Sequence, residues 1–196
     1  MYKKQMTLQR LVCFFVLIAA ALVFVYSLGL VTDMYESSFD IHAQDYYLYD
    51  MEPAVPGTEI FYQIQGFNRT FTVAGLVLIL LAVSQFVFQN HNRRKYYIAN
   101  YITVALNAVA GVAVAVWSVS AIMTYKAQYL QIDEAKLKEV AELKDLYYTL
   151  STFWFDLSIA VAIVLVVANV LNVANLVWKK SLMKAEAKLI QEGKEV

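Results

Sequence analysis

Four long apolar stretches dominate the pattern of hydrophobic and polar positions along the chain. They cover residues 11–32, 71–90, 96–124 and 150–178. An α-helix needs about 20 consecutive apolar residues to cross the hydrocarbon core of a bilayer. The stretches are continuously apolar, whereas the strands of a membrane β-barrel alternate between apolar and polar residues. The pattern therefore predicts an all-α integral membrane protein built as a four-helix transmembrane bundle.

The first segment between these spans, residues 33–70, interleaves aromatic and acidic side chains. So aromatic a segment is not expected to stay fully solvated, so we interpret it as an aromatic, acidic outer loop that either folds over the outer ends of the helices or contacts a partner protein. Within it, residues 59–67 are predicted to form a short extended segment. The candidate partner contacts in this loop are Tyr46, Tyr47, Tyr49, Phe61 and Tyr62.

The other two polar segments have the composition of helices. Residues 125–149 contain a run of helix formers with apolar residues at helical spacing, which predicts a helical hairpin in the second outer segment. Residues 179–193 set apolar side chains against several lysines, which predicts a separate tail helix on the cytoplasmic membrane surface.

Composition and charge agree with this topology. The chain is 60% hydrophobic and 16% charged, whereas soluble domains are about 45–50% apolar and about 25% charged. Residues 1–10, 91–95 and 179–196 hold eleven Lys or Arg and three acids, while residues 33–72 and 125–150 hold twelve acids and five Lys or Arg. Because Lys and Arg accumulate on the cytoplasmic side, we predict a multi-pass cell-membrane protein with both termini in the cytoplasm. The first stretch lacks a cleavage site with small residues, so we interpret it as a retained anchor.

Asp156 is the only charged residue inside a predicted span. An ionisable group in a membrane marks a candidate functional site, because its burial is unfavourable without a partner. Asp156 lies near the start of its helix, where Lys126 or Lys144 could pair with it. A structural role is favoured, and an ion or proton pathway and a partner contact remain alternatives.

The fourth span also carries three asparagines, Asn169, Asn172 and Asn175, spaced three residues apart. Amides in lipid seek hydrogen-bond partners and hold helices together. We predict Asn107 of the third span and Gln85 of the second as those partners. The alternative is that the amides line a polar path.

Small residues on the third span form a second candidate packing surface. Asn107, Gly111 and Ala115 lie four residues apart, which permits close helix approach, with Gly75 of the second span as the expected opposing surface. This face could pack inside the bundle or mediate dimerisation.

No catalytic or metal-binding motif appears. The chain has one cysteine, Cys13, and its two histidines, His42 and His91, are predicted on opposite sides of the membrane. Phosphate loops, nucleophile elbows and zinc-helix motifs are absent, so we expect no enzyme activity, no cofactor and no metal. The acceptor sequence that begins at Asn68 matters only in a host that glycosylates proteins. Nucleic-acid binding is not expected, because the topology explains the basic residues.

Three functions fit these features. The first is a non-catalytic subunit that assembles with a larger membrane complex, such as a transporter or envelope machinery. The second is a small oligomeric transporter or channel that uses Asp156 and the asparagines of the fourth span; the scarcity of charge and the absence of proline in the spans argue against it. The third, less favoured, is a membrane enzyme that acts on lipid-like substrates.

Overall fold

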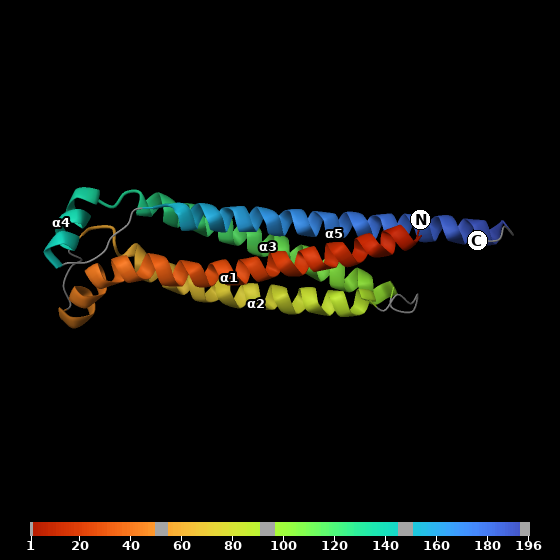
Figure 1. Ribbon diagram of the computed structural model, residues 1–196, viewed down its shortest axis with the longest axis horizontal. Helices are drawn as coiled ribbons and strands as arrows, with labels where there is room; N and C mark the ends of the chain where they lie inside the picture. The colour runs from red at the N-terminus through yellow and green to blue at the C-terminus, as the bar shows by residue number, and fades with distance from the viewer. Residues whose placement is uncertain (1, 50–54, 91–96, 145–150, 193–196) are drawn as a thin grey trace. The chain divides into compact units, whose positions relative to one another are not determined.

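The computed structural model describes residues 2–49, 55–90, 97–144 and 151–192, and this part of the chain is helical without any strand (Figure 1). Four of its helices are long and apolar enough to cross a membrane. The prediction of an all-α protein with four candidate spans is therefore confirmed. The helices are α1 (Tyr2–Tyr49), α2 (Ile60–Asn90), α3 (Tyr97–Tyr129), α4 (Glu134–Lys144) and α5 (Phe153–Gln191).

The first two helices extend into the segment that the sequence pattern assigns to a loop. α1 continues through residues 33–49, and α2 begins at Ile60, so the predicted extended segment at 59–67 is wrong. The reason is the spacing of the apolar side chains, which follows the period of a helix. The buried residues at this spacing are Ile60, Ile64, Phe67 and Phe71.

A short turn precedes α2. Gly57 adopts φ +95°, a backbone conformation that favours glycine. Its N–H donates to Glu59 Oε2 at 2.8 Å, and Thr58 Oγ1 donates to the carbonyl oxygen of Val55 at 2.7 Å. These bonds satisfy polar groups at the start of the helix.

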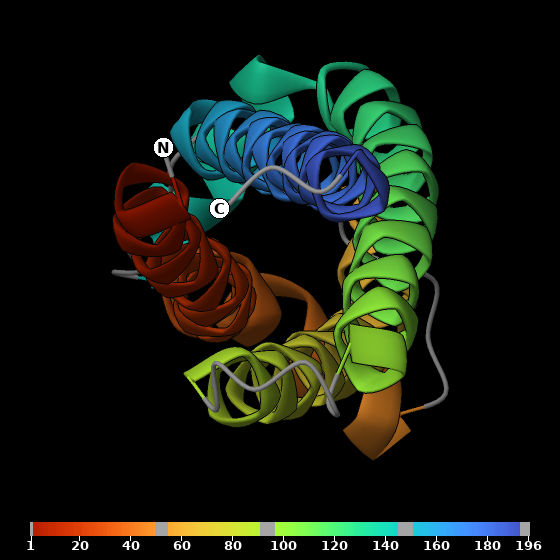
Figure 2. The same cartoon turned by 90° about the vertical axis from the view of Figure 1, so that its right-hand side faces the viewer.

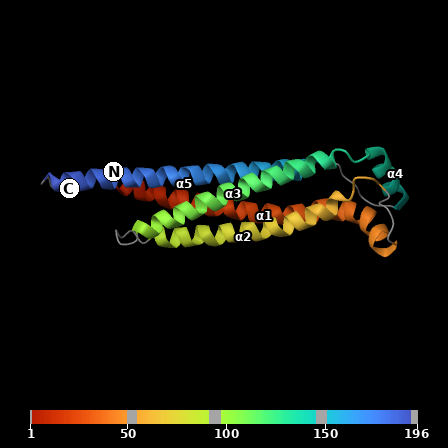
Figure 3. The same ribbon diagram turned by 180° about the vertical axis from the view of Figure 1, so that it is seen from behind.

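The predicted helical piece of the second polar segment is α4, which follows the end of α3 (Figure 3). Asp133 caps α4, because its Oδ1 accepts hydrogen bonds from the N–H groups of Ala135 at 3.0 Å and Lys136 at 3.2 Å. Leu137 and Ala141 lie one turn apart and are both buried.

The tail does not form a helix of its own. α5 runs without a break from Phe153 to Gln191, so residues 179–191 continue the fourth candidate span. No proline or glycine lies within this range, so the sequence contains nothing that would end the helix before Gly193.

The chain divides into two compact units, each of which contains a portion of all four long helices. The first unit contains residues 1–21, 76–115 and 163–196. Figure 2 faces the end with both termini and shows the segments of this unit, in the order α1, α2, α3 and α5, around a common centre. Its core contains many small side chains, among them Ala19, Ala20, Ala82, Ala115 and Ala168.

The second unit contains residues 22–75 and 116–162. Its core is aromatic where that of the first unit is rich in alanine. Phe61 packs edge-on against Tyr129 with ring centroids 6.3 Å apart, and Phe67 lies 5.0 Å from Trp117. Large rings fill the space between the helices of the second unit, whereas small side chains pack between those of the first.

Much of the helix surface outside these cores is apolar. Only 28–39% of the most apolar window in each long helix is buried inside the protein. Large apolar side chains such as Leu80, Val109, Val116 and Val170 are exposed. So extensive an apolar exterior is unfavourable in water and suits a hydrocarbon environment, which supports a multi-pass membrane protein.

Two glycines on α2, Gly75 and Gly66, can be used to test how closely α1 and α2 approach each other in the second unit. A Cβ added to Gly75 would lie 2.9 Å from Phe24 Cα, whereas a Cβ on Gly66 would have no neighbour within 4 Å. We predict that Gly75→Ala lowers the free energy of unfolding by about 1–3 kcal/mol through overpacking. Gly66→Ala, the matched control, should be neutral or stabilise by up to about 1 kcal/mol through helix propensity. Denaturant titration in mild detergent measures both, and equal effects would contradict the close α1–α2 contact.

Candidate functional site

Buried polar side chains gather in the first unit and form what we call the amide seam. The seam comes from α1, α2 and α5, and all its members are buried within the helix segments of this unit. Its members are Gln5, Gln9, Gln85, Asn172, Asn175 and Lys179.

The strongest link in the seam joins α2 to α5. Gln85 Nε2 donates to Asn172 Oδ1 at 2.7 Å, and Asn172 Nδ2 donates back to Gln85 Oε1 at 2.9 Å. Gln85 Nε2 also lies 3.4 Å from Cys13 Sγ of α1. A reciprocal amide pair satisfies a donor and an acceptor on each partner, which is the arrangement that a water-free interior requires. The structure thus pairs Gln85 with the middle asparagine of α5, as the sequence suggested.

A second link joins α1 to α5. Gln5 Nε2 donates to Asn175 Oδ1 at 3.3 Å and to Gln9 Oε1 at 3.1 Å. Lys179 Nζ donates to the same Gln9 oxygen at 3.4 Å. Sequence reasoning missed these three polar contributors, Gln5, Gln9 and Lys179. Their four-residue spacing, Gln5 to Gln9 and Asn175 to Lys179, was the available signal.

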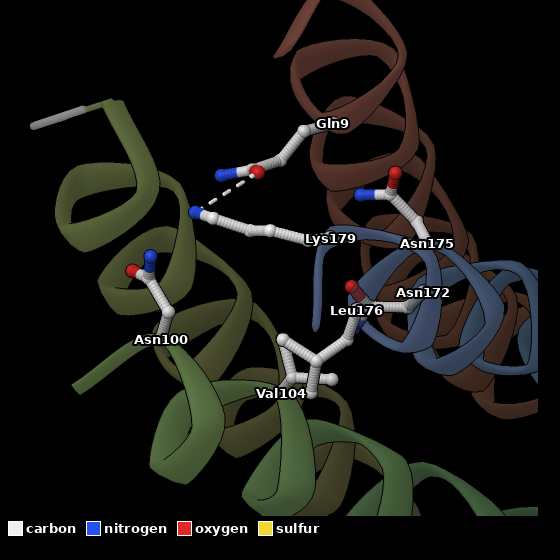
Figure 4. Close-up of a pocket in the computed structure, with 7 residues that line it drawn as sticks. All are labelled: Gln9, Asn100, Val104, Asn172, Asn175, Leu176 and Lys179. Atoms are coloured by element: carbon white, nitrogen blue, oxygen red, sulfur yellow. Dashed lines mark hydrogen bonds between the residues drawn. The ribbon is translucent and has the colours of Figure 1, made fainter. Parts of the chain in front are cut away.

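Residues of α3 lie beside the Lys179 end of the seam. Figure 4 shows Asn100 of α3 across from Lys179, with Gln9 on the other side of the lysine nitrogen. The small gap between these residues leaves no room for a water molecule. The seam is therefore closed at this end in the structure.

Asn107 does not join the asparagines of α5, contrary to the prediction. Its Nδ2 donates to the carbonyl oxygen of Leu81 on α2 at 3.1 Å and to that of Thr103 at 2.9 Å. The side chain points from α3 toward α2, so it ties these two helices through the α2 backbone.

The small residue Gly111 lies against α5. A Cβ at this position would overlap the amide nitrogen of Asn169 and approach its Cγ to 3.0 Å. Asn169 Nδ2 donates to the carbonyl oxygen of Leu165 at 3.0 Å, and Ala115 is buried further along α3. Gly75 is not the opposing surface for this face, because it contacts Phe24 of α1 in the second unit.

Asp156 belongs to the second unit and is half exposed. Its Oδ1 accepts from Lys126 Nζ at 2.5 Å, and its Oδ2 accepts from Thr152 Oγ1 at 3.0 Å. Of the two lysines predicted as candidate partners of Asp156, Lys126 forms the pair. The side chain of Lys144 lies outside the described residues. An ion pair with 55% of the carboxylate side chain exposed contributes little to stability.

Of the five residues predicted to contact a partner, the structure describes the side chain of one. Phe61 is buried against Tyr129 inside the second unit, so it is not available to another protein. Burial of a large ring in the protein's own core is more favourable than its exposure to water. Tyr46, Tyr47 and Tyr49 lie on α1, and Tyr62 lies on α2, but their side chains are outside the described residues.

Asn68 of the glycosylation sequence is buried on α2. Neither polar atom of its side chain has a hydrogen-bond partner among the described residues. A glycosylated asparagine has to reach solvent, so the folded chain does not present Asn68 as an acceptor.

Comparisons of the chain with known protein families, with characterised proteins and with solved structures found no match. The site must therefore be interpreted from its own chemistry. Amide side chains donate and accept hydrogen bonds, but they do not exchange protons in the physiological range, so the seam is suited to joining helices.

The reciprocal pair predicts a specific double-mutant pattern. Gln85→Leu alone should lower the free energy of unfolding by about 1–2 kcal/mol, because it leaves the Asn172 amide without its partner. Asn172→Leu should do the same. The double variant should cost less than the sum of the two, since no buried amide is then left unpaired. Strict additivity in denaturant titrations would show that the two side chains do not interact.

Removal of the Asp156 side chain, in contrast to that of Gln85 or Asn172, is predicted to have little effect on stability. Asp156→Ala should leave thermal unfolding and assembly nearly unchanged, because the ion pair is exposed to solvent. Lys126→Met is the matched variant and should behave in the same way. Size-exclusion chromatography and thermal unfolding in detergent would check both variants. Loss of assembly in either one would assign the pair a structural role that its exposure does not suggest.

Proposed function

We propose that the chain is a non-catalytic multi-pass subunit that assembles with a larger membrane complex. The observation that carries this proposal is a groove between α3 and α5 on the surface of the first unit. The groove has a volume of about 350 Å³. Its lining residues are Ala108, Val112, Asn169, Val170, Val173 and Ala174.

The shape and chemistry of the groove fit a transmembrane helix of the partner. Alanines on both walls permit close backbone approach, and helix association in lipid relies on such close packing. The lining is otherwise apolar, so a partner side chain could replace lipid there without loss of hydration.

Asn169 brings an amide oxygen without a hydrogen-bond donor to the groove. The residue is 2% exposed, and its Oδ1 has no hydrogen-bond partner among the described residues. An unpaired buried amide oxygen costs about 1–3 kcal/mol. A Ser, Thr or Asn on a neighbouring helix would supply the missing donor, whereas a lipid acyl chain would not.

The closed amide seam supports a structural role over transport. The two reciprocal bonds of Gln85 and Asn172 occupy the groups that a permeating solute would need. The gap beside Lys179 has no room for water. A transporter or channel that uses Asp156 and the α5 asparagines is the alternative, and it requires the seam to open.

The proposed topology places both termini in the cytoplasm. This orientation depends on the excess of Lys and Arg near residues 1–10, 91–95 and 179–196. The cell membrane is the proposed location.

A steric block of the groove tests the subunit proposal. Val173→Trp should fill the groove, whereas Val83→Trp on α2 serves as the matched control. The two valines are similarly exposed, at 40% and 42%, and lie at similar depth because each is within two residues of the Gln85–Asn172 pair. The tagged chain is purified from its native membrane in mild detergent, and co-purifying proteins are quantified by mass spectrometry.

We expect a stoichiometric membrane partner with the unmodified chain and with Val83→Trp, and at least a tenfold loss of it with Val173→Trp. Equal recovery with both variants would exclude the groove as the contact surface. A pure homo-oligomer without partners would overturn the subunit proposal and would favour flux assays on Asp156 and the α5 asparagines.

A further inference from the structure

Lys179 differs from the other lysines near the end of α5. It is 7% exposed, whereas its neighbour Lys180 and the later Lys184 and Lys188 are exposed. Exposed lysines at the end of a span are explained by membrane topology. A buried lysine needs a further explanation, because removing an ammonium from water is strongly unfavourable.

The ammonium of Lys179 has no negative partner in the described part of the chain. Its hydrogen bond goes to the neutral Gln9 oxygen at 3.4 Å, a long distance for a charged donor. The ion pairs formed by described residues involve Lys126 and Lys138 instead. An ammonium has three N–H donors, so most of its hydrogen-bonding capacity and all of its charge are left for another molecule.

The groups around Lys179 also favour an anion. Asn100, Asn172 and Asn175 bring neutral amides to the same gap, and no carboxylate lines it. Asn100 is the fourth residue of α3, within the first turn of a helix 33 residues long. The start of such a helix carries partial positive charge and N–H groups without intrahelical partners.

An unpaired acceptor of α3 lies beside these donors. Asn100 is buried, and its Oδ1 has no hydrogen-bond partner in the described residues. A ligand that combines an anion with a hydroxyl donor would satisfy both Lys179 and Asn100. A phosphodiester next to hydroxyl groups has this combination.

We propose that Lys179 and Asn100 form a binding site for a phosphodiester headgroup that carries hydroxyls, supplied by an anionic phospholipid such as phosphatidylglycerol. The gap is smaller than a phosphate group, so binding turns the flexible lysine side chain toward the headgroup layer while the amides stay in place. Basic sites between transmembrane helices are known to suit anionic headgroups. This site is distinct from the α3–α5 groove and does not depend on a partner protein.

The test uses the full chain purified in a neutral detergent. Thermal unfolding is followed with added phosphatidylglycerol, with zwitterionic phosphatidylcholine, and with inorganic phosphate as a soluble source of the same chemistry. Lys179→Gln removes the buried charge, and Lys180→Gln removes the adjacent exposed charge as the matched control. Lys179→Arg keeps the charge, and Asn100→Leu removes the acceptor.

We expect phosphatidylglycerol to raise the unfolding temperature of the unmodified chain and of Lys180→Gln, and phosphatidylcholine to have little effect. The apparent Kd for phosphatidylglycerol should rise about tenfold in Lys179→Gln, which corresponds to the loss of one charge-assisted hydrogen bond. Lys179→Arg should retain most of the effect. Asn100→Leu should weaken it, and this variant carries the test if Lys179→Gln does not fold.

Other outcomes would revise or overturn the assignment. Stabilisation by inorganic phosphate that depends on Lys179 would keep the anion site but assign it to a soluble phosphate. Equal losses in Lys179→Gln and Lys180→Gln would overturn the site in favour of general surface charge. No response of the unmodified chain to phosphatidylglycerol or phosphate would also overturn it.

Discussion

The structure depends on one constraint. The interior of a helix bundle in hydrocarbon holds no water that could form hydrogen bonds with polar side chains. Each buried amide must then find its partner on another helix or on the backbone. Gln85 and Asn172 meet this requirement with two reciprocal bonds. Asn107 meets it through backbone carbonyls on α2 and α3. These bonds select a particular helix pairing from the many that apolar surfaces alone would allow, because a rotated helix would leave its amides unpaired.

The two compact units satisfy the need for close packing in different ways. The first unit combines small side chains with the amide seam, and Gly111 leaves space for the Asn169 side chain. The second unit relies on stacked aromatic rings and on the contact between Gly75 and the α1 backbone at Phe24. Its one described ion pair that joins two helices, Lys126 with Asp156, lies where solvent reaches it. The reciprocal amide pair of the first unit is therefore buried, whereas the ion pair of the second unit is exposed.

Lys179 and Asn169 are among several exceptions to this pairing, and both underlie the functional proposals. Asn169 has an unpaired amide oxygen beside the α3–α5 groove, and Lys179 has a buried charge without a counter-ion. In a stable protein such groups carry a cost that another molecule can offset. The proposed occupants follow from the missing chemistry, a hydrogen-bond donor on a partner helix in the first case and an anionic headgroup in the second. The two sites can be tested independently, because each has its own variant and its own control.

The helical class and the four candidate spans could be predicted without the structure, because the length of an apolar stretch is a local property that does not depend on neighbouring helices. The sequence also offered Gln85 as a partner for the asparagines of the fourth span, and the structure assigns it to Asn172. Three features could not be predicted from the sequence: Asn107 binds the α2 backbone, Gly75 faces α1, and Lys179 is buried while Lys180 is exposed. These outcomes depend on the rotation of each helix about its axis. That rotation is set by contacts between residues far apart in the chain, and a continuously apolar helix carries little periodic signal to reveal it.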